Sequence, residues 1–174
     1  MGVRGVASLK EKDLSYAIMA MIISTSLAVI AVGLPIENFL SEYIVSRDFP
    51  WYVAWRVAVA EFLLWICSLL LNTFEEKLSA YLLFFSSILF AMAHYYELYM
   101  ISPYSSEVLG IACKADIYPL FYMYTCNFAN GFSGTTLYLD MGQILPLITF
   151  FVLTPREVVL RNIKAILRTF RRVL

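Results

Sequence analysis

Charged and strongly polar residues are scarce in this sequence of 174 residues. Only 15% of the residues are charged and 61% are hydrophobic, whereas soluble domains have about 25% charged and 45–50% apolar residues. A water-soluble fold could not cover its surface with so few polar groups, so the excess apolar side chains must face lipid. The composition therefore predicts an integral membrane protein.

Other shortages exclude whole classes of site. The formal net charge is zero, which argues against nucleic acid as a partner. His94 is the only histidine, so haem sites with two histidine ligands and metal sites with three are excluded. We therefore expect no cofactor. A haem held by His94 and Met141 is an alternative without further support. No phosphate-binding loop, nucleophile elbow or dinucleotide fingerprint occurs. The single glutamine, Gln143, is compatible with a thermophilic protein.

Long apolar segments predict four membrane spans within a single domain, residues 1–174. The spans cover residues 16–36, 52–72, 80–101 and 137–153. The first three approach the ~20 residues that a hydrocarbon core of ~30 Å requires, while the fourth is shorter and contains Asp140, Gln143 and Pro146. A further apolar stretch, residues 117–129, has only 13 residues, which favours an interfacial or re-entrant segment.

Basic residues predict the orientation. Ten of the 13 lysines and arginines lie before the first span, between the second and third, or after the fourth. The positive-inside rule assigns these segments to the cytoplasm, and leaves residues 37–51 and 102–136 as outer loops. We therefore predict an all-α membrane protein, a four-helix transmembrane bundle in the cell membrane with both termini cytoplasmic.

Residues 155–174 carry the pattern of an amphipathic helix. Thr154, Pro155 and Glu157 fit a helix start with a capping box. Apolar residues then recur at helical spacing among basic ones, which are Arg161, Lys164, Arg168, Arg171 and Arg172. Such a helix is expected to lie on the inner leaflet and bind anionic lipid. A docking helix for a cytoplasmic partner is the alternative.

Two of the three cysteines are predicted to form a disulfide. Cys113 and Cys126 share the second outer loop, where an oxidising exterior favours their pairing. Closing a loop of this size would stabilise the fold by roughly 3 kcal/mol in the chain-entropy model. The sequence lacks the Cys-x-x-Cys pair of thiol oxidases, so we expect no redox function. Cys67, in the second span, is expected to be a small buried apolar residue.

Four ionisable residues are predicted to share one layer of the membrane. Counted at about 1.5 Å per helical residue, Arg56, His94, Glu97 and Asp140 all fall in the outer third of the bilayer. His94 and Glu97 are three positions apart and so share a helix face. An Arg56–Glu97 ion pair, with Asp140 near His94, would neutralise charges that lipid cannot stabilise.

Glu61 is predicted to lie near the bilayer midplane. Ser24, Thr25 and Ser26 of the first span have a similar depth. Because an ionised carboxylate is costly there, Glu61 should be protonated, hydrogen-bonded or part of a polar path. Ionisable residues within spans either serve function or tie helices together, and the sequence leaves both alternatives open.

The spans are rich in Phe, Tyr and Leu, and four such helices enclose little room for a substrate. We therefore expect a non-enzymatic subunit or scaffold of a larger membrane complex, with other membrane proteins as partners. One alternative is a proton-conducting, ion-conducting or small transport protein that uses Glu61 and the outer layer of ionisable residues. Another is an enzyme that acts at the outer face through Asp140, His94 and Glu97.

Overall fold

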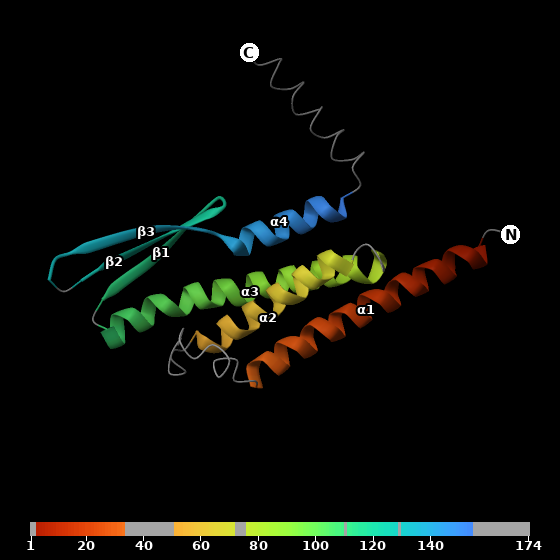
Figure 1. Ribbon diagram of the computed structural model, residues 1–174, viewed down its shortest axis with the longest axis horizontal. Coiled ribbons are helices and arrows are strands. Elements are labelled where there is room, and N and C mark those ends of the chain that lie inside the picture. Colours follow the sequence, from red (N-terminus) through yellow and green to blue (C-terminus); the bar gives the residue numbers. More distant parts are fainter. Residues whose placement is uncertain (1–2, 34–50, 72–75, 110, 129, 155–174) are drawn as a thin grey trace, which may run out of the picture.

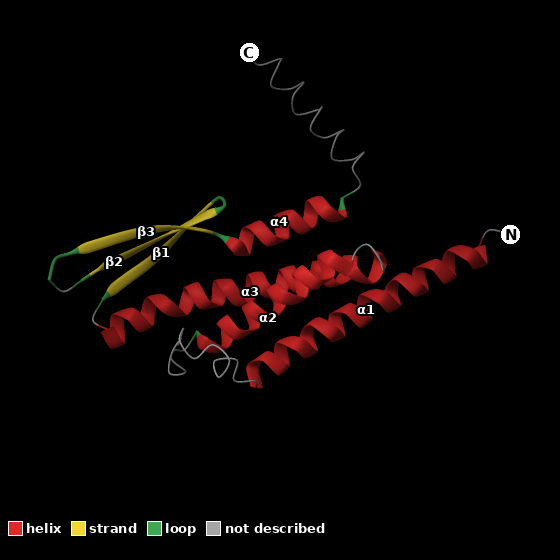
Figure 2. Cartoon of the chain, viewed as in Figure 1, coloured by secondary structure: helices red, strands yellow, loops and turns green. Residues whose placement is uncertain are grey.

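The computed structural model describes residues 3–33, 51–71, 76–109, 111–128 and 130–154. Its elements in chain order are α1 (Val3–Gly33), α2 (Tyr52–Leu71), α3 (Glu76–Leu109), β1 (Ala112–Tyr118), β2 (Phe121–Asn127), β3 (Ser133–Leu139) and α4 (Met141–Leu153). The helices lie side by side, and the sheet continues from one end of α4 along the last part of α3 (Figure 1). Figure 2 shows the helical region and the sheet as two adjoining parts.

Three helices are long and apolar enough to cross a membrane. The crossing segments are Asp13–Gly33 in α1, Tyr52–Leu71 in α2 and Glu76–Ile101 in α3. At about 1.5 Å per residue, each covers a hydrocarbon core of about 30 Å. These helices agree with the first three predicted spans over their described residues, and they are compatible with a membrane location.

The fourth predicted span, residues 137–153, is wrong at its start. Residues 137–139 belong to β3, and α4 has only 13 residues. That length corresponds to about 20 Å, less than the hydrocarbon core. Threonine, tyrosine and leucine fill the end of β3 and fit a strand, and Asp140 then starts the helix.

The prediction of an all-α fold is incomplete, because part of the region predicted as an outer loop, residues 102–136, forms a sheet. Strands β1, β2 and β3 are antiparallel and pair in that order. The apolar stretch 117–129 covers the end of β1, a turn and β2. Its described residues are therefore strand and turn, and an interfacial or re-entrant position for the stretch stays a prediction.

A narrow seam of small residues attaches α1 to the other helices. From Asp13 on, where the side chains of α1 are described, its buried residues are Ala20, Ser24 and Ala31, and small side chains let helix backbones approach closely in a membrane. Only 17% of the apolar 18-residue segment of α1 that could cross a membrane is buried in the structure. Most of this segment of α1 is therefore left uncovered by the rest of the chain.

Candidate functional site

Asp140 lies at the junction between the sheet and α4. It is the N-cap of α4, and its Oδ1 accepts the backbone N–H of Gln143 at 3.2 Å. Its side chain is fully buried, with 0% exposed. The spacing Asp-x-x-Gln before an apolar run is a capping-box pattern, so the sequence contains a signal for this helix start that the predicted fourth span overlooks.

Three side chains surround the Asp140 carboxylate. The Tyr95 hydroxyl donates to Oδ2 at 3.0 Å, and Nε2 of Gln143 donates to the same oxygen at 2.8 Å. The Nε2 atom of His94 lies 3.4 Å from Oδ1, which is an ion-pair distance for a protonated imidazole. The expected proximity of His94 and Asp140 is confirmed, whereas Tyr95 and Gln143 were not predicted to take part.

Gly142 permits this close approach of α3 and α4. A Cβ atom at Gly142 would lie 2.7 Å from Cδ2 of His94 and 3.1 Å from Oδ1 of Asp140. The His94 ring also stacks on Phe90, with 5.8 Å between the ring centroids, and meets Tyr122 of β2 edge-on at 5.9 Å. His94 therefore contacts residues from α3, α4 and the sheet.

The β1–β2 turn is fixed to α4 through three hydrogen bonds. Oε1 of Gln143 accepts the Leu120 N–H at 3.0 Å, and Nε2 donates to the Tyr118 carbonyl at 2.9 Å. The Asp140 N–H donates to the Leu120 carbonyl at 2.9 Å. Leu120 has a φ of 67°, a left-handed conformation that is costly for leucine and that surrounding contacts must hold. This arrangement fixes the sheet to the helices.

Glu61 forms a separate polar site between α1 and α2. Its side chain has no exposed surface, and Oε2 accepts a hydrogen bond from the Ser24 hydroxyl at 2.7 Å. The predicted hydrogen bond to the first span is therefore present. Of the other two candidate donors, Thr25 donates instead to carbonyl oxygens of its own helix, those of Met21 and Ile22.

The predicted ion pair between Arg56 and Glu97 is not formed. Arg56 is buried, and its guanidinium carbon lies 4.7 Å from the centre of the Tyr52 ring on the preceding turn of α2. No ion pair joins Arg56 to Glu97 among the residues that the structure describes. Glu97 is partly buried on α3 and lies close enough to Tyr122 of β2 to affect its ionisation.

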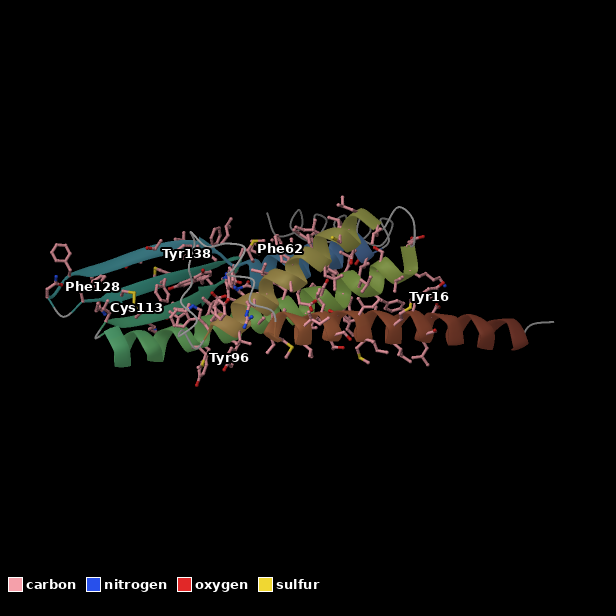
Figure 3. The ribbon with its side chains drawn as sticks, turned by 60° about the horizontal axis from the view of Figure 1, so that its bottom comes forward. Tyr16, Phe62, Tyr96, Cys113, Phe128 and Tyr138 are labelled. Carbon is pink, nitrogen blue, oxygen red and sulfur yellow. A yellow bond between two sulfur atoms is a disulfide. The ribbon has the colours of Figure 1, made fainter. Side chains whose placement is uncertain are left out.

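The predicted disulfide between Cys113 and Cys126 is present. The two residues are directly opposite each other on β1 and β2, and Figure 3 shows the bond between their sulfur atoms in the sheet. Cys67 is free but exposed on α2, so the prediction that it is buried is wrong. The basic residues of the predicted inner-leaflet helix, residues 155–174, lie outside the described residues.

Metal and haem chemistry gain no support from these positions. Within the described ranges, no group of three or more His, Cys, Asp or Glu side chains could hold a metal ion. One of the two ring nitrogens of His94 faces the Asp140 carboxylate.

Comparisons with known proteins find no relative. The sequence matches no protein-family model. Compared with curated proteins and with solved structures, it likewise shows no significant similarity. The indications of function therefore come from the sequence and the geometry of this chain.

Proposed function

We propose that this protein is a small non-enzymatic subunit of a membrane assembly and that its sheet binds another protein. The observation that carries the proposal is the absence of charge in residues 121–139, which hold β2, β3 and the loop between them. Surfaces that face water usually contain about 25–35% charged residues. A β-hairpin without charged residues is therefore suited to a surface that another protein covers.

Strand β3 supports this proposal because both of its faces are open. All seven of its side chains are exposed, including Leu137 at 62%. Its outer edge carries no Lys, Glu or Pro, the residues that commonly prevent edge strands from pairing. At the other edge of the sheet, β1 contains the Lys114–Asp116 ion pair and contacts α3.

The loop between β2 and β3 exposes two phenylalanines. Phe132 is 76% exposed and Phe128 is 43% exposed. Their backbones pair through a hydrogen bond of 2.8 Å from the Phe128 N–H to the Phe132 carbonyl. Figure 3 shows Phe128 at the end of the sheet farthest from the bundle. Rigid apolar side chains in such a position are typical of binding anchors.

In this proposal α4 is a short fourth crossing, around which the bilayer thins locally to match its length of about 20 Å. Both termini are cytoplasmic, and the sheet lies outside the cell membrane. Two observations support the arrangement. The start of α1 and the end of α4 lie at the same end of the bundle (Figure 1). An ion pair between Asp13 and Lys77 also joins the start of the α1 span to the start of α3. Anionic inner-leaflet lipid is the proposed partner of residues 155–174.

Native electrophoresis of membranes solubilised in mild detergent tests the proposal. Wild-type protein is expected to migrate in a complex much larger than the single chain of 19.9 kDa. Leu137→Lys, which puts a charge on β3, should release the chain from that complex. Ala112→Lys is the matched control, because it puts the same charge on exposed Ala112 of β1 and should leave the complex intact. Wild-type migration at the single-chain size would contradict the proposal.

A further inference from the structure

The Glu61 carboxyl group lies at the middle of the membrane-spanning part of the bundle. Glu61 is about 14 Å from the Tyr52 end of α2 and about 15 Å from the Leu71 end, at 1.5 Å per residue. The hydrocarbon core is about 30 Å thick, so both ends of α2 reach water while Glu61 sits near the midplane. No part of its side chain is exposed.

Glu61 receives too few hydrogen bonds to remain ionised. A carboxylate has about four acceptor sites, but only Ser24 donates to this one, at Oε2. Oε1 is buried and has no hydrogen-bond partner within the described parts of the chain. An unpaired charge at the bilayer centre costs several kcal/mol. The neutral acid avoids this cost, with Oε2 as the carbonyl oxygen that Ser24 contacts and Oε1 as the hydroxyl.

No described cation faces Glu61 to offset a negative charge. From α1 it meets Ser24, and the ionisable groups of the helices packed around it lie toward the bundle ends. Asp13, Tyr16, Lys77 and Tyr81 are at one end, and Arg56, His94, Glu97 and Asp140 are toward the other. Arg56 is the nearest of these along α2, but five residues rotate it by about 140° around the helix axis. Glu61 and Arg56 therefore point in different directions.

The helix that covers Glu61, α1, has few buried side chains. From α1, Ser24 contacts Glu61 directly, and the other buried side chains of residues 13–33 are the small Ala20 and Ala31. Helices associate in lipid through van der Waals contacts. Three small side chains make fewer of these contacts than large ones, so a small separation of α1 from α2 costs less.

We propose that Glu61 and Ser24 form a proton-binding site at the membrane midplane. The ligand is a single proton, held on Oε1 and exchanged with water when α1 separates from α2. On release, the O–H bond breaks, the proton passes to water and the carboxylate keeps the electron pair. Rebinding reverses the step. This site is independent of partner binding by the sheet.

Infrared difference spectroscopy of the protein in liposomes tests this site. The spectrum of wild type minus Glu61→Gln is expected to show a carboxylic-acid C=O band at neutral pH. The band should shift after equilibration in D₂O, because the proton exchanges. Glu97→Gln is the matched control, since it removes a partly buried carboxyl group from α3 and should leave the Glu61 band in place.

Two results would overturn the proposal. Absence of the band at neutral pH would show that Glu61 is ionised. A band that does not shift in D₂O would show that the proton is only a fixed part of a helix contact. If Glu61→Gln fails to fold, Ser24→Ala provides the same assignment, because removing the hydroxyl donor must move the frequency of the Glu61 band. A band that Ser24→Ala leaves unmoved would then count against the site.

Discussion

Gln143 on α4 accepts the backbone N–H of Leu120 in the β1–β2 turn, and the distance between Oε1 and the nitrogen is 3.0 Å. The same side chain also donates to the Tyr118 carbonyl and to Asp140. One amide therefore joins the apolar helix α4, its N-cap and a strained turn. This relationship makes the junction testable by single substitutions.

Gln143→Leu is expected to destabilise the protein by about 1–3 kcal/mol, because polar groups of the turn lose their partners. Denaturant unfolding in detergent measures the change, and hydrogen exchange at the Leu120 amide should become faster. Thr136→Ala, on the exposed strand β3, is the control and should change the free energy of unfolding by less than about 0.5 kcal/mol. Equal stability of Gln143→Leu and wild type would show that the amide does not hold the turn.

Leu120→Gly is expected to stabilise the protein by up to about 1 kcal/mol, since glycine adopts a positive φ without the steric cost that leucine meets. Gly131→Ala provides the opposite test. Gly131 has a φ of 82°, and no atom lies within 4 Å of the position that a Cβ would take there, so alanine should destabilise through the backbone alone. If the unfolding temperatures of both variants move in the same direction, the positive φ at these two positions does not explain the changes in stability.

Gly142→Ala is expected to destabilise the protein by about 1–3 kcal/mol, because the new Cβ would force α3 and α4 apart. Gly33→Ala is the matched control, since nothing lies within 4 Å of its Cβ position. Thermal unfolding of the two variants separates the clash from the general effect of replacing a helical glycine. If both variants unfold at the wild-type temperature, the close contact of His94 with α4 is not required.

Ionisation of the Tyr122 hydroxyl is expected to lower the stability of the fold at alkaline pH. Burial, followed by the charge of nearby Glu97, raises the pKa of the Tyr122 hydroxyl above its usual value of 10.0. A raised folded-state pKa means that the neutral form is favoured in the fold. Its contribution to stability is complete below pH 10 and is lost as the pH rises through the folded-state pKa.

Tyr122→Phe should therefore reduce the alkaline loss of stability, because no phenol remains to ionise. Unfolding measured at neutral pH and above pH 10 gives the comparison. Tyr96→Phe removes an exposed hydroxyl from α3 and serves as the control. An alkaline loss that is the same in Tyr122→Phe and wild type would assign the effect to another group.

Counting along the sequence predicted the level of each residue along the bundle better than the direction in which its side chain points. Counting along antiparallel helices placed Glu61 level with Ser24, and His94 level with Asp140, and both pairs are in contact. The same counting failed for Arg56 and Glu97, because depth alone does not give the angle around the helix axis. Arg56 lies against Tyr52 instead.

The sheet was not predicted, because its strands lack the usual signal. β2 is almost uniformly apolar or aromatic, so the alternation of polar and apolar residues that identifies a half-buried strand is missing. The same apolar character made residues 137–139 resemble the start of a membrane span. Asp140 and Gln143 separate strand from helix, but their meaning depends on a turn, at Leu120, about twenty residues earlier in the chain.

The direction of β3 limits how two copies of the protein can pair through this edge strand. Its strand runs nearly along the helices in both views (Figures 1 and 3). Antiparallel pairing of two identical edge strands requires a twofold axis perpendicular to the strands. In the proposed arrangement, with the helices crossing the membrane, such an axis lies in the membrane plane and turns the second copy upside down. In that arrangement two neighbours in one bilayer cannot pair antiparallel through β3, and antiparallel self-pairing through this edge would connect chains that sit in two facing membranes.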